Sequence, residues 1–250
     1  MIALYKPSEI KETPLLYFSL QQYFFIMNEL IFFLHIAAIF LFTLGSLRIG
    51  KEALITWICL QAVLANLFVL KQTVLFGYTV TCSDAFAVGT LLGLNIMQEY
   101  YGKDAAKKTG QICFFCMILF SLFAKIHLLY IPAIQDHMHP IYEELLTPAP
   151  RLLLASLFVF FLVQKIDRKI FHFLKCQKNP SPFAVRNLFS LSISQLLDTV
   201  LFTFLGLYGV LSNLGDIICI SFLLKTTAAL LLTPTLWLLT KYIPPTKVLS

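Results

Sequence analysis

The chain has 250 residues, of which 58% are hydrophobic and only 13% are charged, and its formal net charge is +6. This composition excludes an ordinary soluble domain and leaves no stretch for a separate nucleotide-hydrolysing domain, since each membrane-spanning helix needs about 20 apolar residues. It predicts an all-α fold, a polytopic membrane helix bundle of roughly six to seven transmembrane helices surrounded by the lipid bilayer.

Residues 1–52 are expected to form an N-terminal extension with one additional transmembrane helix, ahead of a six-helix core over residues 53–250. The span in the extension is predicted over residues 30–47, where an apolar run ends before two basic residues. Residues 1–26 mix charges, prolines and aromatic residues without a signal-peptide cleavage pattern. They indicate either an interfacial segment or sequence upstream of a start at Met27.

The core begins with an apolar span predicted over residues 53–70. The next span, over residues 80–101, is the most polar of all. Residues spaced at i, i+3 and i+4, or about three turns apart, lie on one side of a helix. This spacing predicts a polar face made of Asp84, Asn95, Gln98 and Glu99.

The next segment is expected to turn. Gly102 is typical of the end of a helix, and the sequence KDAAKK after it is predicted to be a basic loop. A fourth span is predicted over residues 109–131, followed by a loop over residues 132–150. His137 and His139 in this loop lack a third ligand at a fixed spacing, which favours a solvated loop over a metal site.

A fifth span is predicted over residues 151–171, ending in KIDRK, which is expected to open the most basic loop. The sixth span, over residues 187–210, carries Asp198 at its middle. A carboxylate in a membrane costs several kcal/mol unless it faces the protein interior or water, so this residue is a candidate functional group. Helical spacing predicts an inward polar strip that contains Ser194, Gln195, Asp198 and Thr199. Hydrogen bonding between helices is the alternative role of this strip.

The seventh span is predicted over residues 217–241, after a short turn, with Pro234 as an expected kink. Lys225 lies well inside this span. A buried charge without a partner is costly, so Lys225 is expected to pair with Asp198 when no ligand is present.

The basic residues define an orientation. Thirteen of the 19 Lys and Arg residues fall on one side of the predicted membrane. Because cytoplasmic loops collect basic residues, the C-terminus is expected to be cytoplasmic, with the N-terminus outside for seven spans and inside for six. This topology explains the net positive charge, so no nucleic-acid partner is predicted.

No metal or cofactor is predicted. Cys113 and Cys116 form a CxxC inside an apolar run, without the second ligand pair that a zinc site needs. This pattern is typical of buried thiols.

Four stretches in the same order resemble one family, the queuosine precursor transporters, also called the vitamin uptake transporter family. They are LNIMQEYYGKDAAKK (residues 94–108), RLLLASLFVFFLVQKIDRKIF (151–171), SQLLDTVLFTFLG (194–206) and FLLKTTAALLLTPTLW (222–237). The resemblance covers residues 53–242. Two features depart from the family pattern: Asn95 stands where many members carry Asp, and a span precedes residue 53.

The resemblance implies uptake of 7-deazaguanine bases, such as queuine, preQ1 or preQ0, across the cytoplasmic (inner) membrane. Such a base presents neighbouring N–H donors, a carbonyl acceptor and a flat ring, which suit carboxylates, amides and aromatic side chains. We predict Asp198 or Glu99 as the carboxylate and Lys225 as its competitor. The other candidates are the hydrogen-bonding residues Gln195, Asn95, Gln98, Ser194 and Thr199, and the aromatic residues Phe202 and Tyr208.

Three alternatives remain open at this point. The first is a substrate-binding membrane subunit that needs a partner ATPase. The second is an intramembrane enzyme, although no HExxH pair or activated nucleophile is evident. The third is a structural scaffold, which has little use for polar groups inside several helices. The oligomeric state is also left open.

Overall fold

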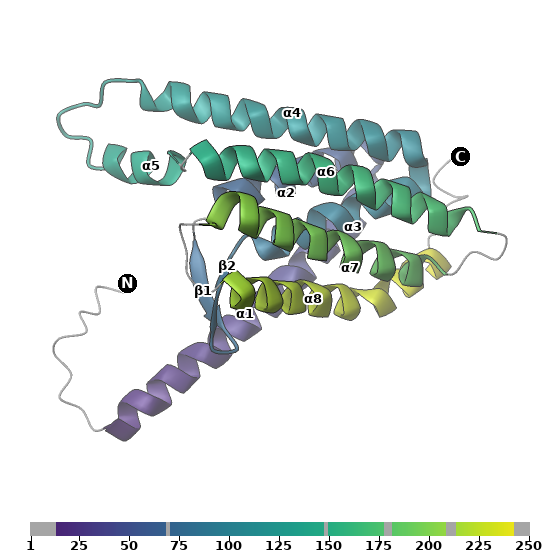
Figure 1. The fold of residues 1–250 in the computed structure, drawn as a ribbon, viewed down its shortest axis with the longest axis horizontal. Coiled ribbons are helices and arrows are strands. Elements are labelled where there is room, and N and C mark those ends of the chain that lie inside the picture. The colour runs from purple at the N-terminus through teal and green to yellow at the C-terminus, as the bar shows by residue number, and fades with distance from the viewer. Residues whose placement is uncertain (1–13, 69–70, 148–149, 178–181, 209–213, 243–250) are drawn as a thin grey trace.

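A computed structural model describes residues 14–68, 71–147, 150–177, 182–208 and 214–242. In these ranges the chain forms eight α-helices, one π-helical turn and one β-hairpin, with the long helices side by side (Figure 1). The elements are α1 (Pro14–Ile49), α2 (Lys51–Leu67), β1 (Gln72–Leu75), β2 (Tyr78–Thr81), α3 (Asp84–Tyr101), α4 (Lys103–Leu128), α5 (His139–Leu146), α6 (Pro150–Lys175), α7 (Phe183–Phe202), η1 (Thr203–Leu207) and α8 (Leu214–Tyr242).

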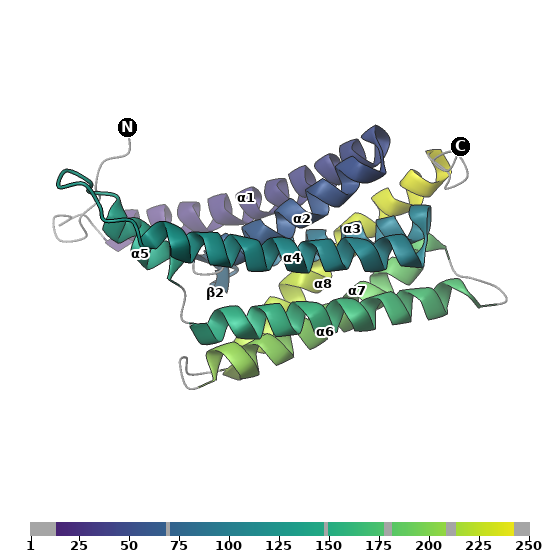
Figure 2. The ribbon, with the colours of Figure 1, turned by 90° about the horizontal axis from the view of Figure 1, so that it is seen from above.

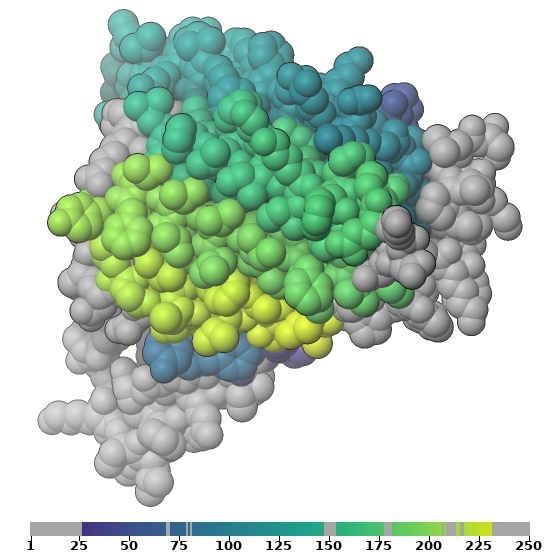
Figure 3. All heavy atoms as spheres, turned by 45° about the vertical axis from the view of Figure 1, so that its right-hand side comes forward, coloured from purple at the N-terminus to yellow at the C-terminus, as the bar shows by residue number. Residues whose placement is uncertain are grey.

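Helix α3 is the centre of the bundle. Fifteen of its 18 residues are buried, and it contacts α1, α2, α4, α6, α7 and α8. Seen from above (Figure 2), α3 and α8 lie between the α1–α2 pair and the α6–α7 pair. Helices α4, α6, α7 and α8 form successive bands on one face of the molecule (Figure 3). Polar groups on α3 therefore lie inside the protein.

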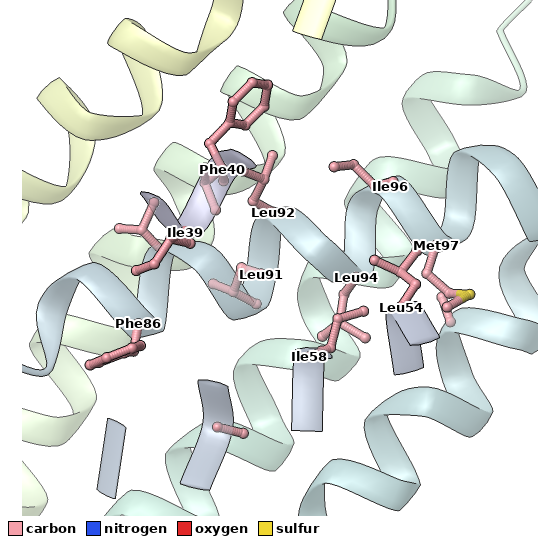
Figure 4. Packing of buried hydrophobic residues seen from close by; sticks show 14 of the residues in the cluster. Ile39, Phe40, Leu54, Ile58, Phe86, Leu91, Leu92, Leu94, Ile96 and Met97 are labelled. Carbon is pink, nitrogen blue, oxygen red and sulfur yellow. The ribbon is translucent and has the colours of Figure 1, made fainter. Parts of the chain in front are cut away.

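Apolar side chains pack α3 closely against α1 and α2 (Figure 4). Leu92, Leu94 and Met97 of α3 are at most 1% exposed. Gly93 allows the α2 residue Ile58 to approach, since a Cβ atom at Gly93 would lie 2.7 Å from its Cγ1. This close packing fixes the position of the polar face on the opposite side of α3.

Gly89→Ala is expected to destabilise the bundle. The added Cβ atom would lie 2.6 Å from Ile39 Cγ2 and would also clash with Gln61 Oε1. Overpacking of this kind costs about 1–3 kcal/mol. The measurement is thermal unfolding of the purified protein in detergent, with Gly45→Ala as the matched control because nothing lies within 4 Å of the Cβ position there. Equal melting temperatures for the two variants would contradict the packing described here.

The start of the predicted third span was wrong. Residues 72–81 form a hairpin in which Leu75 pairs with Tyr78, and α3 begins only at Asp84. Phe76 and Gly77 have φ angles of 53° and 82°, as a two-residue turn with left-handed central residues requires. The β-branched residues flanking this turn favour strands. An all-α fold therefore describes the bundle but omits this hairpin.

Three predicted loops also differ from the structure. The KDAAKK sequence is the start of α4, because Gly102, with φ 89°, separates two helices directly. The KIDRK sequence lies within α6, and the predicted loop at 132–150 contains α5. Lys and Ala favour helices, so a basic sequence by itself did not indicate a loop. Residues 1–13 and residue 213 of the turn before the seventh span lie outside the described residues.

Within the described ranges, three helical segments are long and apolar enough to cross a membrane: Met27–Ile49, Lys103–Leu128 and Phe183–Gly206. A shorter apolar helical stretch, Ile218–Leu231, lies within α8.

Candidate functional site

Helix α7 has its apolar side outside and its polar side inside. Phe189, Ile193 and Leu196 are 59%, 42% and 41% exposed. A water-soluble protein would show the reverse pattern, whereas in a membrane the exposed apolar face meets lipid. The buried side carries, among other residues, the polar side chains of Asn187, Ser190, Ser194, Gln195 and Thr199. The candidate site is this buried face, where α7 meets α3, α6 and α8.

A group of charged residues, here called the Lys225 cluster, lies toward the hairpin end of the bundle. Lys225 Nζ is 2.9 Å from Asp198 Oδ2 and 3.4 Å from Asp84 Oδ1. It also donates a hydrogen bond of 3.2 Å to Thr199 Oγ1. Ser221 donates a hydrogen bond of 3.1 Å to Asp84 Oδ2. The Lys225 cluster thus consists of Lys225, Asp198, Asp84, Thr199 and Ser221. The predicted pairing of Lys225 with Asp198 is confirmed, and Asp84 joins it.

The Lys225 cluster contains two carboxylates and one ammonium group. The side chains of Lys225 and Asp84 are 5% and 10% exposed, whereas that of Asp198 is 26% exposed. Asp198 is therefore the most accessible charge in the cluster. A carboxylate in this position can exchange its lysine partner for donors on a ligand.

A second group, the Glu99 cluster, lies toward the Gly102 end. Glu99 Oε1 is 2.7 Å from Arg186 Nη2, and Glu99 Oε2 is 3.2 Å from Lys175 Nζ. Lys175 also donates to the backbone carbonyl of Glu99 at 3.0 Å. The guanidinium of Arg186 lies over the ring of Phe171. The structure therefore does not bring Glu99 and Asp198 together.

A third group, the central polar cluster, consists of Asn95, Gln98, Asp167, Asn187, Ser190 and Ser194. Asn95 Nδ2 donates to Asn187 Oδ1 at 3.1 Å and links α3 to α7. Gln98 Nε2 donates to the backbone carbonyl of Arg168 at 3.3 Å and links α3 to α6. Ser190 and Ser194 donate to Asp167 Oδ1 at 2.6 and 2.7 Å and link α7 to α6.

Asp167 was missed by the sequence analysis. It lies in the KIDRK sequence, which was expected to open a loop, yet it is only 1% exposed. Its basic neighbours indicated a solvated segment, because runs of charged residues usually lie in solvent. The spacing of Ser190 and Ser194, four residues apart, was a usable signal, since it places two hydroxyl groups on one face of α7.

The remaining candidates have different surroundings. Gln195 is fully buried, and neither atom of its side-chain amide has a hydrogen-bond partner among the described residues. Phe202 is partly buried and packs against the hydrophobic core, whereas Tyr208 is 62% exposed. The middle of the apolar segment Phe183–Gly206 falls between Ser194 and Gln195. Asp198 therefore lies about 5 Å from the middle, measured along the helix.

The three clusters follow one another along the antiparallel α3 and α7 helices. Asp84 lies near Asp198, Asn95 contacts Asn187, and Glu99 contacts Arg186. Asp84 and Glu99 are about 22 Å apart along α3 at 1.5 Å per residue. The site is thus a polar seam through an apolar bundle, with ion pairs at both ends and with amides, two hydroxyl groups and the carboxylate of Asp167 between them. It is suited to hydrogen bonding of a polar molecule within the membrane.

Known proteins match the part of the chain that contains this seam. The family described as "Putative vitamin uptake transporter" matches residues 83–239, which is more than half of the chain. One similar protein is the probable queuosine precursor transporter of Bacillus subtilis (strain 168). It is 31% identical over 180 residues, which cover 70% of this chain and 77% of that protein. No solved structure gives a significant match.

Proposed function

The chain belongs to the vitamin uptake transporter family, and from this premise we propose that it takes up queuosine precursors across the cytoplasmic membrane. It is a multi-pass membrane protein and a transporter, not an enzyme. The proposed substrates are 7-deazaguanine bases such as queuine, preQ1 or preQ0. The observation that carries the proposal is the polar seam, because buried charges in membrane helices are costly and mark pathways for polar substrates.

We propose a seven-span topology formed by α1, α2, α3, α4, α6, α7 and α8. The basic residues at the Gly102 end support placing that end in the cytoplasm, together with the C-terminus. The Glu99 cluster would then lie on the cytoplasmic side and the Lys225 cluster nearer the outside. The seam would connect the two sides.

We propose that Asp198 is the first carboxylate to meet the base. The base donates N–H groups to Asp198 and displaces Lys225 Nζ, which lies 2.9 Å from Asp198 Oδ2. Occupancy of the site thereby alters the contact between α7 and α8. The neighbouring hydrogen-bonding groups are Gln195 and Thr199, with Ser194, Asn95 and Gln98 deeper in the seam, and Phe202 provides an aromatic ring near the end of α7. Glu99 is held by Arg186 and Lys175, so we assign it to the cytoplasmic end of the pathway.

Supplying deazaguanine bases to cells that express this chain tests the proposed function. In a bacterial strain that cannot make queuosine or import its precursors, expression of this chain is expected to restore queuosine in tRNA when a deazaguanine base is supplied. The measurement is the queuosine content of tRNA after feeding each base separately. An empty vector is the control. Absence of queuosine, with the protein shown to be in the membrane, would contradict the proposal.

A substrate-binding subunit with a partner ATPase is the second candidate, favoured by the vitamin uptake named in the family description. In that case, purification of the chain from membranes is expected to yield a nucleotide-binding protein. Uptake would also need that protein. Uptake into vesicles that contain only the purified chain would exclude this candidate.

A further inference from the structure

The strongest feature beyond the proposed entry site is the buried carboxylate of Asp167. Its Oδ1 accepts hydrogen bonds from Ser190 and Ser194 at 2.6 and 2.7 Å. Its Oδ2 is buried and has no hydrogen-bond partner among the described residues. Arg168, the next residue, directs its guanidinium to Gln164 Oε1 at 3.3 Å. An acceptor is therefore left free inside the protein.

Two more atoms of the central polar cluster share this property. Gln98 Oε1 and Asn187 Nδ2 are buried and lack hydrogen-bond partners in the described part of the chain. Their residues are 1% and 0% exposed. The other amide atom of each residue is engaged, in Gln98 by the carbonyl of Arg168 and in Asn187 by Asn95. These bonds restrict how the free atoms can turn.

The depth of Asp167 matches a central binding position. Its two hydroxyl donors belong to residues 190 and 194 of α7. The middle of the segment Phe183–Gly206 lies just beyond Ser194. Asp167 therefore lies within about 5 Å of the middle of the membrane segment, on the side of the Glu99 cluster. A buried polar group without a partner is costly at this depth, which points to a ligand that supplies the missing partners.

The free atoms are of the donor and acceptor types that one edge of a guanine-like base requires. Asp167 Oδ2 and Gln98 Oε1 are acceptors, whereas Asn187 Nδ2 is a donor. A deazaguanine offers a ring N–H group and an exocyclic amino group as donors beside a carbonyl acceptor. The two acceptors and one donor of the protein thus match the two donors and one acceptor of the base. A base without the exocyclic amino group would leave one acceptor unpaired.

We propose that Asp167 is the carboxylate that binds the N–H edge of the base at the middle of the membrane. This assignment rests on the proposed function and adds a second position to it, beyond the entry position at Asp198. Ser190 and Ser194 are positioning residues that hold Oδ1 and turn Oδ2 toward the base. Gln98 and Asn187 complete the edge. The exocyclic amino group of the substrate is therefore recognised at this position.

Equilibrium binding to the purified full-length chain in detergent tests this assignment. The probes are preQ0 and the matching base without its exocyclic amino group. The wild-type protein is expected to bind preQ0 more tightly by roughly 10-fold to 100-fold. The base without the amino group loses a hydrogen bond to a charged group and leaves a buried acceptor unpaired. In Asp167→Asn the ratio of the two affinities is expected to fall to about 1. Asp104→Asn, which changes an exposed carboxylate on α4, should keep the wild-type ratio.

Each outcome bears on the assignment. An unchanged ratio in a folded Asp167→Asn protein would overturn it while leaving the proposed function intact. Absence of binding of either base to the wild-type protein would overturn both. If Asp167→Asn does not fold, Ser194→Ala is the second variant, because it removes one positioning hydroxyl and keeps the carboxylate. Its ratio is expected to fall by about 3-fold or more, and an unchanged ratio would overturn the assignment.

Discussion

Replacement of Lys225 by Met is expected to abolish uptake and to lower the free energy of unfolding by about 3–5 kcal/mol. The change leaves Asp84 and Asp198 without the ammonium group that lies 3.4 and 2.9 Å from them. Two carboxylates then share a largely buried site and repel each other. The measurements are uptake of a labelled deazaguanine in cells and thermal unfolding of the purified protein.

Variants of Asp84 and Asp198 distinguish an effect on stability from an effect on transport. Asp84→Asn leaves one carboxylate for one ammonium group and is expected to cost much less stability than Lys225→Met. Asp198→Asn likewise leaves a balanced pair but removes the proposed substrate contact, so uptake is expected to fall. Lys125→Met is the control for loss of a lysine, since Lys125 is exposed on α4. Wild-type uptake by both Lys225→Met and Asp198→Asn, at normal expression, would refute the role assigned to this cluster.

Replacement of Arg186 by Met is expected to have the second largest effect. Glu99 would lose its closest partner, at 2.7 Å, and would keep only Lys175, whose side chain is 35% exposed. Removing one member of a buried ion pair costs about 3 kcal/mol or more, so we expect a lower melting temperature. Uptake is expected to fall as well, because this cluster joins α3, α6 and α7 at the proposed cytoplasmic end. Thermal unfolding and uptake measure the two effects.

Two control variants accompany Arg186→Met. Arg186→Lys keeps the charge and should retain part of the stability, although lysine does not reproduce the flat guanidinium over Phe171. Lys169→Met changes an exposed basic residue on α6 and should resemble the wild type. An unchanged melting temperature in Arg186→Met would mean that the ion pair does not stabilise the bundle.

Much of the architecture could be predicted from the order of the residues alone. Long apolar runs predicted helices in each region where the structure has a long helix, because a chain in lipid must satisfy its backbone groups internally. Helical spacing also identified the inward face of α7, including Ser194 and Gln195, which are fully buried. The pairing of Lys225 with Asp198 followed from the cost of leaving either charge alone. These properties depend on composition and local spacing.

The tertiary structure decided which polar groups meet. Asn95 and Asn187 are 92 positions apart in sequence, and the partners of Glu99 come from α6 and α7. Helical spacing gives the face of one helix but not the neighbour or the depth that this face meets. The sequence therefore indicated Asp198 and Glu99 as alternatives for one carboxylate position, whereas packing around α3 places them at opposite ends of the seam. The same packing buries Asp167 opposite Ser190 and Ser194, because the contact between α6 and α7 is set by residues far apart in the chain.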